Sequence, residues 1–323
     1  MRMRGILYLL GCLTAFGAGP AVAGTYLLPA PGESLVGHEQ LASARYQDTL
    51  LDIARQYNLG YEDIKLANPG VDTWIPGQNM PVVLPTRFLL PDAPREGMVI
   101  NIAEMRLYYY PKELRDGRQV VVTHPVSIGR DDWKTPLGLT SIVRKDKDPA
   151  WYPPKSIRKE HAAEGDPLPA VVPPGPDNPL GKYALRLGIP GYLIHGTDKP
   201  FGIGMQVTHG CMRLYPEDIE RMFRTVPVGT PVRIINQPVK TGWHRGQLFV
   251  EVHPELGENE QKPPNMNRAL DKIAQSLQGR GEYSVDWAWA EGLVMEQRGI
   301  PLPVREQGMR GQTQPETYTS GPW

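Results

Sequence analysis

The segment that decides this fold runs from Tyr192-Leu193-Ile194-His195 to Thr208-His209-Gly210-Cys211-Met212-Arg213. The apolar run before His195 predicts a strand, and Gly196-Thr197 marks the point where the strand gives way to a loop. Gly210 allows the backbone a sharp turn and a close approach by another molecule. The segment therefore predicts that a strand end and a rigid turn hold one histidine and one cysteine.

A cysteine that attacks a carbonyl needs a base, because a free thiol with a pKa of ~8.5 is ionised only to a few per cent at neutral pH. His195 and His209 are the candidate bases, since an imidazole exchanges protons in this range. The amides of Gly210 and Cys211 are candidate donors to an oxyanion. Arg213 supplies a fixed positive charge for a carboxylate.

Each of these residues also has an ordinary structural role. A buried cysteine often serves as a small apolar core residue, and a histidine at a strand end or an arginine after a loop is often structural or solvated. A zinc site made of His195, His209 and Cys211 would lack a fourth protein ligand and Cys-x-x-Cys spacing. We therefore expect no metal and no cofactor.

Residues 1–23 have the features of a cleavable signal peptide. Arg2 and Arg4 precede an apolar run that continues to about Gly19, and Ala21-Val22-Ala23 supplies the pattern that a signal peptidase cleaves. A membrane anchor is the alternative, but the run is shorter than the ~20 apolar residues of a bilayer span. A lipoprotein is another, since Leu9-Leu10-Gly11-Cys12 loosely resembles a lipobox. We expect cleavage after Ala23.

Cleavage there removes Cys12 and leaves Cys211 as the only thiol, so an internal disulfide is excluded. The content of 40% apolar and 22% charged residues predicts a globular protein. Lysine plus arginine and aspartate plus glutamate number 35 each, which argues against a nucleic-acid partner. The 34 glycines and 34 prolines favour a loop-rich, β-rich architecture.

A compact unit is expected at residues 41–86, after an extended lead-in over residues 25–40. Apolar residues at 50, 53, 54 and 57 predict a helix, which Asp48 or Thr49 caps. Residues 61–68 predict a second helix, and residues 80–84 predict a strand. The expected order is β-α-α-β, and a proline-containing stretch over residues 85–97 links this unit to the next.

The remaining chain predicts a strand-rich domain over residues 97–236, which includes a helix that begins at Pro216. Nine prolines lie between Pro149 and Pro179, and they argue against a helix or a central strand there. This long loop is expected to be a lid or groove wall that presents Trp151 and Tyr152, or else a packed structural excursion. An extension over residues 237–304 contains a hairpin and helices near 266–278 and 284–298, and residues 305–323 are expected to be disordered.

The motifs around His195 and Cys211 resemble the signature of the L,D-transpeptidases, the family with the YkuD-type fold. Gly129, Lys134-Thr135-Pro136-Leu137-Gly138, Pro149-Ala150-Trp151 and residues 178–185 match the family too, so the resemblance covers residues 97–236. The preceding unit resembles a LysM domain through Gln47-Asp48-Thr49-Leu50, Asn68, Pro76-Gly77 and Leu84-Pro85, although the usual first glycine is absent. This pairing is similar to the periplasmic ErfK/YbiS group of Gram-negative bacteria.

The resemblance implies a mainly β fold with some α: a β-sandwich catalytic domain, a small LysM-like domain and a partly helical extension. It makes Cys211 the nucleophile, and it makes His195 the base, which the Gly196-Thr197 loop orients. His209 is a supporting residue, because some members have serine there. The expected substrate contacts come from the remaining candidates, Arg213, Thr208, Trp151 and Tyr152.

The reaction implied is attack on the L-centre carbonyl of meso-diaminopimelate in a tetrapeptide stem, with loss of D-Ala and formation of a thioester. An amine then accepts the acyl group, from a second stem or from the C-terminal lysine of an outer-membrane lipoprotein. The expected partners are therefore peptidoglycan stem peptides, glycan strands and such a lipoprotein. Two alternatives stay open: an L,D-carboxypeptidase or amidase on the same scaffold, and a non-catalytic glycan-binding protein.

Overall fold

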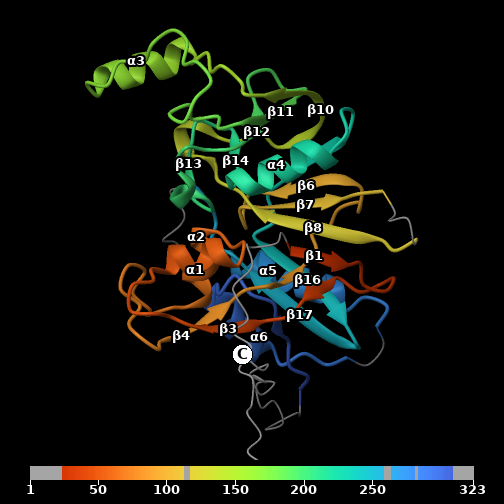
Figure 1. The fold of residues 1–323 in the computed structure, drawn as a ribbon. Coiled ribbons are helices and arrows are strands. Elements are labelled where there is room, and N and C mark those ends of the chain that lie inside the picture. Colours follow the sequence, from red (N-terminus) through yellow and green to blue (C-terminus); the bar gives the residue numbers. More distant parts are fainter. Residues whose placement is uncertain (1–23, 113–116, 258–262, 281–282, 308–323) are drawn as a thin grey trace, which may run out of the picture.

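The computed structural model describes residues 24–112, 117–257, 263–280 and 283–307 (Figure 1). The expected signal peptide therefore lies outside the described residues, as does most of the expected tail. The described chain is a mixed α/β protein whose elements follow most of the expected positions.

The N-terminal unit has the predicted order, with β3 (Gln40–Ser43), α1 (Leu50–Gln56), α2 (Tyr61–Ala67) and β4 (Pro81–Leu84). Thr49 caps α1: its side chain accepts a hydrogen bond from the Asp52 amide, and the Asp52 carboxylate accepts one from the Thr49 amide. β3 pairs with β4, and β2 (Leu35–Gly37) pairs with β5 (Arg87–Leu89). The stretch expected to be a linker thus contains a strand.

The largest sheet has nine strands. In spatial order they are β1 (Gly24–Leu27), β8 (Val120–Pro125), β7 (Arg106–Tyr110), β6 (Gly97–Asn101), β15 (Pro231–Ile235), β10 (Gly138–Lys147), β11 (Tyr183–Leu187), β12 (Leu193–His195) and β14 (Met212–Arg213). The lead-in was expected to be merely extended, but β1 pairs with β8 at the edge of this sheet. The short strands β9 (Ile128–Gly129) and β13 (Gln206–Thr208) pair separately.

The expected two-sheet sandwich is instead one sheet that curls around its core. β10 pairs with β15 through its first half and with β11 through the rest, and its register shifts between Ile142 and Arg144. Residues from both halves of the sheet, such as Ile100 and Ile194, lie in one apolar cluster. α4 (Pro216–Thr225) adds Ile219 and Met222 to that cluster.

β6, β7 and β8 are buried on both faces. Side chains alternate along a strand, so Leu107 and Tyr109 point into the catalytic core while Tyr108 and Tyr110 pack with the N-terminal unit. Two apolar faces explain why these strands lack alternation between apolar and polar residues in the sequence.

The C-terminal extension builds a third core. β16 (Val239–His244), β17 (Gln247–Val252) and β18 (Leu302–Pro303) form a sheet, covered by α5 (Met266–Ser276) and α6 (Trp287–Glu296). Both helices lie within their predicted ranges. Residues 305–307 belong to the stretch expected to be disordered, but backbone hydrogen bonds hold them: the amides of Asp286 and Gln307 donate to the carbonyls of Arg305 and Ser284.

The prediction that the proline-rich stretch excludes a helix is wrong. α3 (Lys155–Ala163) lies within it and projects from the rest of the fold (Figure 1). The reason is the distribution of the prolines: none lies between Pro154 and Pro167, and Pro154 stands at the N-cap, where proline does not interrupt helical hydrogen bonds.

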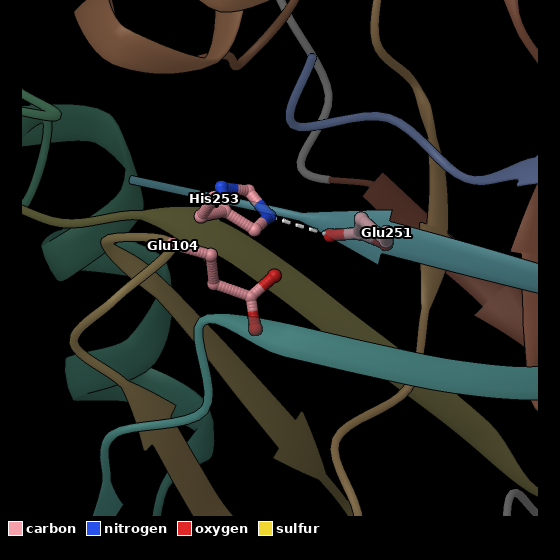
Figure 2. Close-up of side chains that lie close together, drawn as sticks. All are labelled: Glu104, Glu251 and His253. Carbon is pink, nitrogen blue, oxygen red and sulfur yellow. Dashed lines mark hydrogen bonds and ion pairs between the residues drawn. The ribbon is translucent and has the colours of Figure 1, made fainter. Parts of the chain in front are cut away.

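A buried ionic cluster joins the three units. The Lys240 ammonium on β16 contacts Glu104, between β6 and β7, and Glu251 on β17. It also donates to the carbonyl of Leu89, the last residue of β5, at 2.7 Å. Glu104, Glu251 and His253 have the spacing of metal ligands (Figure 2), but the Lys240 ammonium already supplies the cation. Burial raises the pKa of Glu251, and Lys240 and His253 more than offset this and lower it to about 2.

We predict that Lys240→Met lowers the free energy of unfolding by about 3–5 kcal/mol, because two carboxylates would lose their buried cation. Lys272→Met is the matched control: Lys272 pairs with the exposed Asp92, and such a pair contributes at most about 1 kcal/mol. Urea titrations of both variants measure the difference. Equal losses would show that the buried cluster is no more stabilising than a surface pair.

Candidate active site

His195 ends β12, and Cys211 directly precedes the neighbouring strand β14. β12 and β14 run parallel, with Ile194 opposite Met212 and His195 opposite Arg213. Ile194 and Met212 point into the catalytic core, so His195 and Arg213 point to the other face. Cys211 precedes Arg213 by two residues and shares its side. The register thus places the thiol diagonally across from the imidazole.

Two threonine hydroxyls fix the turn before Cys211. Thr208 Oγ1 accepts from the Gly210 amide at 3.1 Å and donates to the Cys211 carbonyl at 2.6 Å. Thr135 Oγ1 accepts from the Gly129 amide and donates to the Gly210 carbonyl, both at 2.9 Å. Gly210 has a φ of 97°, and a Cβ there would lie 2.7 Å from the Tyr192 ring. The turn therefore requires glycine.

These hydrogen bonds concern the roles expected of the Gly210 amide and of Thr208. The Gly210 amide, a candidate oxyanion donor, is already engaged by Thr208, so the Cys211 amide is the remaining candidate of the two. Thr208 was expected at the substrate, but its hydroxyl binds within the turn. Gly196 and Thr197 shape the loop after β12: the Gly196 amide donates to the Tyr183 carbonyl, and Thr197 Oγ1 accepts from the Lys199 amide.

His195 is buried and held in one tautomer. Its Nδ1 lies 2.7 Å from the Gly196 carbonyl oxygen, and because a carbonyl only accepts, Nδ1 carries the proton. Nε2 is then the unprotonated ring nitrogen, and backbone hydrogen bonds of the ring to Gly196 and Leu180 both act to raise its pKa. Burial, and secondarily the charge of Arg213, lower the pKa of His195 to about 3, so the imidazole is neutral at neutral pH.

The Cys211 thiol is also neutral at rest. Its Sγ lies 3.6 Å from the Gly191 carbonyl oxygen. Burial raises the pKa of the thiol, and a backbone hydrogen bond from Leu193 and the charges of Arg213 and Arg186 only partly oppose this rise. The thiol and the imidazole are therefore both neutral at rest, and a general-base step suits this state better than a preformed ion pair.

His209 contacts α3, which lies in the proline-rich stretch over residues 149–179. Its Nε2 lies 3.2 Å from Glu160 of α3, and Glu160 also pairs with Arg130. Its ring lies 5.2 Å from that of Trp133 and 6.3 Å from that of His161, between centroids. These contacts connect α3 to the turn that carries Cys211, and no local pattern in the sequence indicated Glu160, which is 49 residues from His209.

The two aromatic residues expected at the substrate, Trp151 and Tyr152, lie within the proline-rich stretch over residues 149–179. Trp151 pairs with Val172 across it, and Tyr152 is 68% exposed. Among the described residues, no hydrogen bond or ring contact connects either of them to Cys211 or His195. The structure thus connects Arg213 to both His195 and Cys211, and it gives no support to substrate roles for Trp151 and Tyr152.

Comparison with known proteins decides the family. Residues 95–234 match the L,D-transpeptidase catalytic domain of the YkuD family. The probable L,D-transpeptidases YcfS and YbiS of Escherichia coli K12 are both 41% identical to this chain. The YcfS match covers 91% of this chain and 92% of the relative, and the YbiS match covers 90% and 97%. The chain belongs to the L,D-transpeptidase family.

The family is one of cysteine-dependent acyltransferases that act on peptidoglycan, and the match falls within its ErfK/YbiS/YcfS group. L,D-transpeptidase 3 of Mycobacterium tuberculosis aligns in space with a TM-score of 0.32 at 17% identity, over 66% of this chain and 99% of that one. The catalytic-domain match begins at residue 95 and leaves the N-terminal unit uncovered. Among the described helices, none has the length and apolarity of a membrane span.

We predict that alkylation of Cys211 by iodoacetamide speeds up with pH to beyond pH 9, because burial raises the pKa of the thiol and only the thiolate reacts. His195→Ala is expected to leave the shape of this profile unchanged, since the imidazole is neutral throughout. Intact-mass spectrometry gives the rates, with Cys211→Ser as the blank. A plateau between pH 6 and 7 would indicate a resting thiolate–imidazolium pair and contradict this view.

Proposed function

We propose that this L,D-transpeptidase acts on tetrapeptide stems through Cys211. Nε2 of His195 accepts the thiol proton while Sγ attacks the L-centre carbonyl of meso-diaminopimelate. The carbonyl is restored as the amide bond to D-Ala breaks, and the proton passes from His195 to the leaving amine. The observation that supports this most is the tautomer of His195, whose Nδ1 hydrogen bond to Gly196 leaves Nε2 as a base on the face of Cys211.

The groups around the thiol suit the charges of this reaction. The Cys211 amide is the candidate donor to the oxyanion, and Arg213 and Arg186 bring positive charge close enough to affect the pKa of Cys211. A stem peptide carries carboxylates, which guanidinium groups bind well. We assign Arg213 to substrate binding, and His209 to support of the turn through Glu160.

The thioester then meets an acceptor. The amine of a second stem gives a 3→3 cross-link, and the C-terminal lysine of an outer-membrane lipoprotein gives an anchored protein. In each case the amine attacks the thioester carbonyl and the Cys211 thiolate leaves, taking a proton through His195. We place this activity in the periplasm, after cleavage behind Ala23.

The expected products test this proposal. Purified protein incubated with a disaccharide-tetrapeptide should give a species of dimer mass minus D-Ala, or an adduct when another amine is added. Cys211→Ala and His195→Ala should lose this activity by at least about a hundredfold, since each removes a reacting group. A tripeptide without dimer or adduct would indicate an L,D-carboxypeptidase, and lack of any turnover would favour a non-catalytic glycan-binding protein.

We further propose that residues 41–86 form a LysM-like, glycan-binding domain. Its β-α-α-β order supports this, as do three exposed side chains, Tyr46, Trp74 and Ile75, which are 84%, 63% and 77% exposed. The Leu50 amide donates to the Thr73 carbonyl, which brings the loops that bear these residues together. Exposed apolar groups that gather on one surface mark a binding site more often than isolated ones do.

Cosedimentation with insoluble peptidoglycan measures whether this domain binds glycan. In a Cys211→Ala background, which excludes covalent capture, Tyr46→Ala with Trp74→Ala should weaken cosedimentation about tenfold or more, given ~1 kcal/mol for each aromatic contact. Trp287→Ala, at a partly exposed tryptophan of the C-terminal extension, is the matched control. Equal cosedimentation of all three proteins would refute a glycan-binding role for this surface.

A further inference from the structure

The loop between His195 and Cys211 is attached to the N-terminal unit. The amides of Tyr61 and Glu62, in the first turn of α2, donate to the carbonyls of Ile203 and Gly204 at 2.9 and 3.3 Å. These carbonyls belong to the loop that leads into β13 and then to Thr208. Backbone bonds from a helix end therefore hold the entry to the cysteine turn.

The contact is too close for side chains. Gly60 and Gly204 face each other, and a Cβ on Gly204 would lie 2.5 Å from the Gly60 Cα and 2.5 Å from the Tyr61 amide nitrogen. Gly204 also has a φ of 81°. Both the space and the backbone angle therefore demand glycine, and the two backbones meet in a single register.

The segment after Cys211 is attached to the same part of the N-terminal unit. The Tyr215 hydroxyl donates to the Leu59 carbonyl at 3.0 Å. Asn58 Nδ2 donates to both oxygens of Asp218 in α4, at 2.9 and 2.7 Å. Asp218 is fully buried and also lies 3.2 Å from His124. Residues 58–62, which we call the α1–α2 corner, thus bind the chain on both sides of Cys211.

We propose that the α1–α2 corner is a positioning element for the transpeptidase reaction, with Gly204 and Tyr215 as its positioning residues on the catalytic side. It fixes the loop before the cysteine turn and the start of α4 after it, and so fixes the separation of Cys211 from His195. A misplacement of about 1 Å can reduce a rate about a hundredfold. The N-terminal unit then contributes to the rate of the reaction through the geometry of the site, even on substrates that carry no glycan. This inference rests on the assignment of Cys211 and His195.

A route for this effect is visible in the backbone. Thr208, whose hydroxyl fixes the cysteine turn, lies four positions after Gly204, and on the way β13 pairs with β9. The Ser127 hydroxyl donates to the Gly202 carbonyl at 2.7 Å, which ties the same loop to the main sheet. A shift at Gly204 therefore reaches Thr208 through a short, hydrogen-bonded segment.

The test uses the full mature chain and a glycan-free tetrapeptide stem, so that glycan binding cannot contribute. Tyr215→Phe should lower kcat about two- to tenfold, as expected for one hydrogen bond, and Gly204→Ala should lower it about tenfold or more. KM should stay within about twofold for both, because neither residue contacts the substrate. Tyr26→Phe, which loses a hydroxyl bond to the Thr86 carbonyl, and Gly70→Ala, at an open site with a φ of 83°, are the matched controls.

The outcomes separate this inference from the proposed function. Activity that survives Cys211→Ala would overturn the nucleophile assignment. Inactive Cys211→Ala together with wild-type kcat in folded Tyr215→Phe and Gly204→Ala would overturn only the positioning role. If Gly204→Ala shows no cooperative thermal transition, Tyr215→Phe decides alone, and an unchanged kcat in this variant refutes the proposal.

Discussion

The packing of the three units depends on ion pairs that neutralise the charges buried at the central strands. β6, β7 and β8 have an apolar layer on each face, and Arg106 and Lys240 lie in that dry interior. A buried charge without a partner destabilises a fold by several kcal/mol. Arg106 pairs with Asp63 of the N-terminal unit, and Lys240 of the C-terminal extension pairs with Glu104 of the central sheet. These ion pairs thus favour one arrangement of the three chain segments, because another docking would leave a buried charge without its partner.

Desolvation also affects the charges of the active site, where His195 is buried and Cys211 is partly buried. Burial keeps the Cys211 thiol and the His195 imidazole uncharged at rest. The hydrogen bond to the Gly196 carbonyl stabilises the tautomer of His195 that carries its proton on Nδ1. A neutral pair avoids the desolvation that an ion pair would incur, so charge develops only as the substrate arrives. Arg213 lies directly opposite His195 and disfavours the imidazolium, which in the reaction that we propose would favour transfer of the proton from His195 to the leaving amine.

Local patterns in the sequence predicted what is locally determined. The 3.6-residue period of apolar residues predicted α1, for which Thr49 was one of two candidate caps, and Pro216 predicted the start of α4. β10 escaped prediction because apolar residues lie on both of its faces: Leu139 and Val143 are exposed, whereas Ile142 is buried. α3 was hidden by the prolines around it. The Glu160 contact of His209 and the Asp63 partner of Arg106 arise from segments 49 and 43 residues apart, and such pairing leaves no trace in a single sequence.

The stretch after β4 shows why the units do not behave as tethered modules. Its prolines suggested a linker, yet Leu89 is buried, its amide donates to Glu251, and its carbonyl accepts from Lys240. A flexible linker would let a glycan-binding domain sample many distances from the thiol, and only effective concentration would connect the two. Here the N-terminal unit is bonded to the chain on both sides of Cys211. Any glycan held at Trp74 would therefore lie at a set distance from the thiol. The fold itself would then select which stem peptide along the glycan strand reaches Cys211.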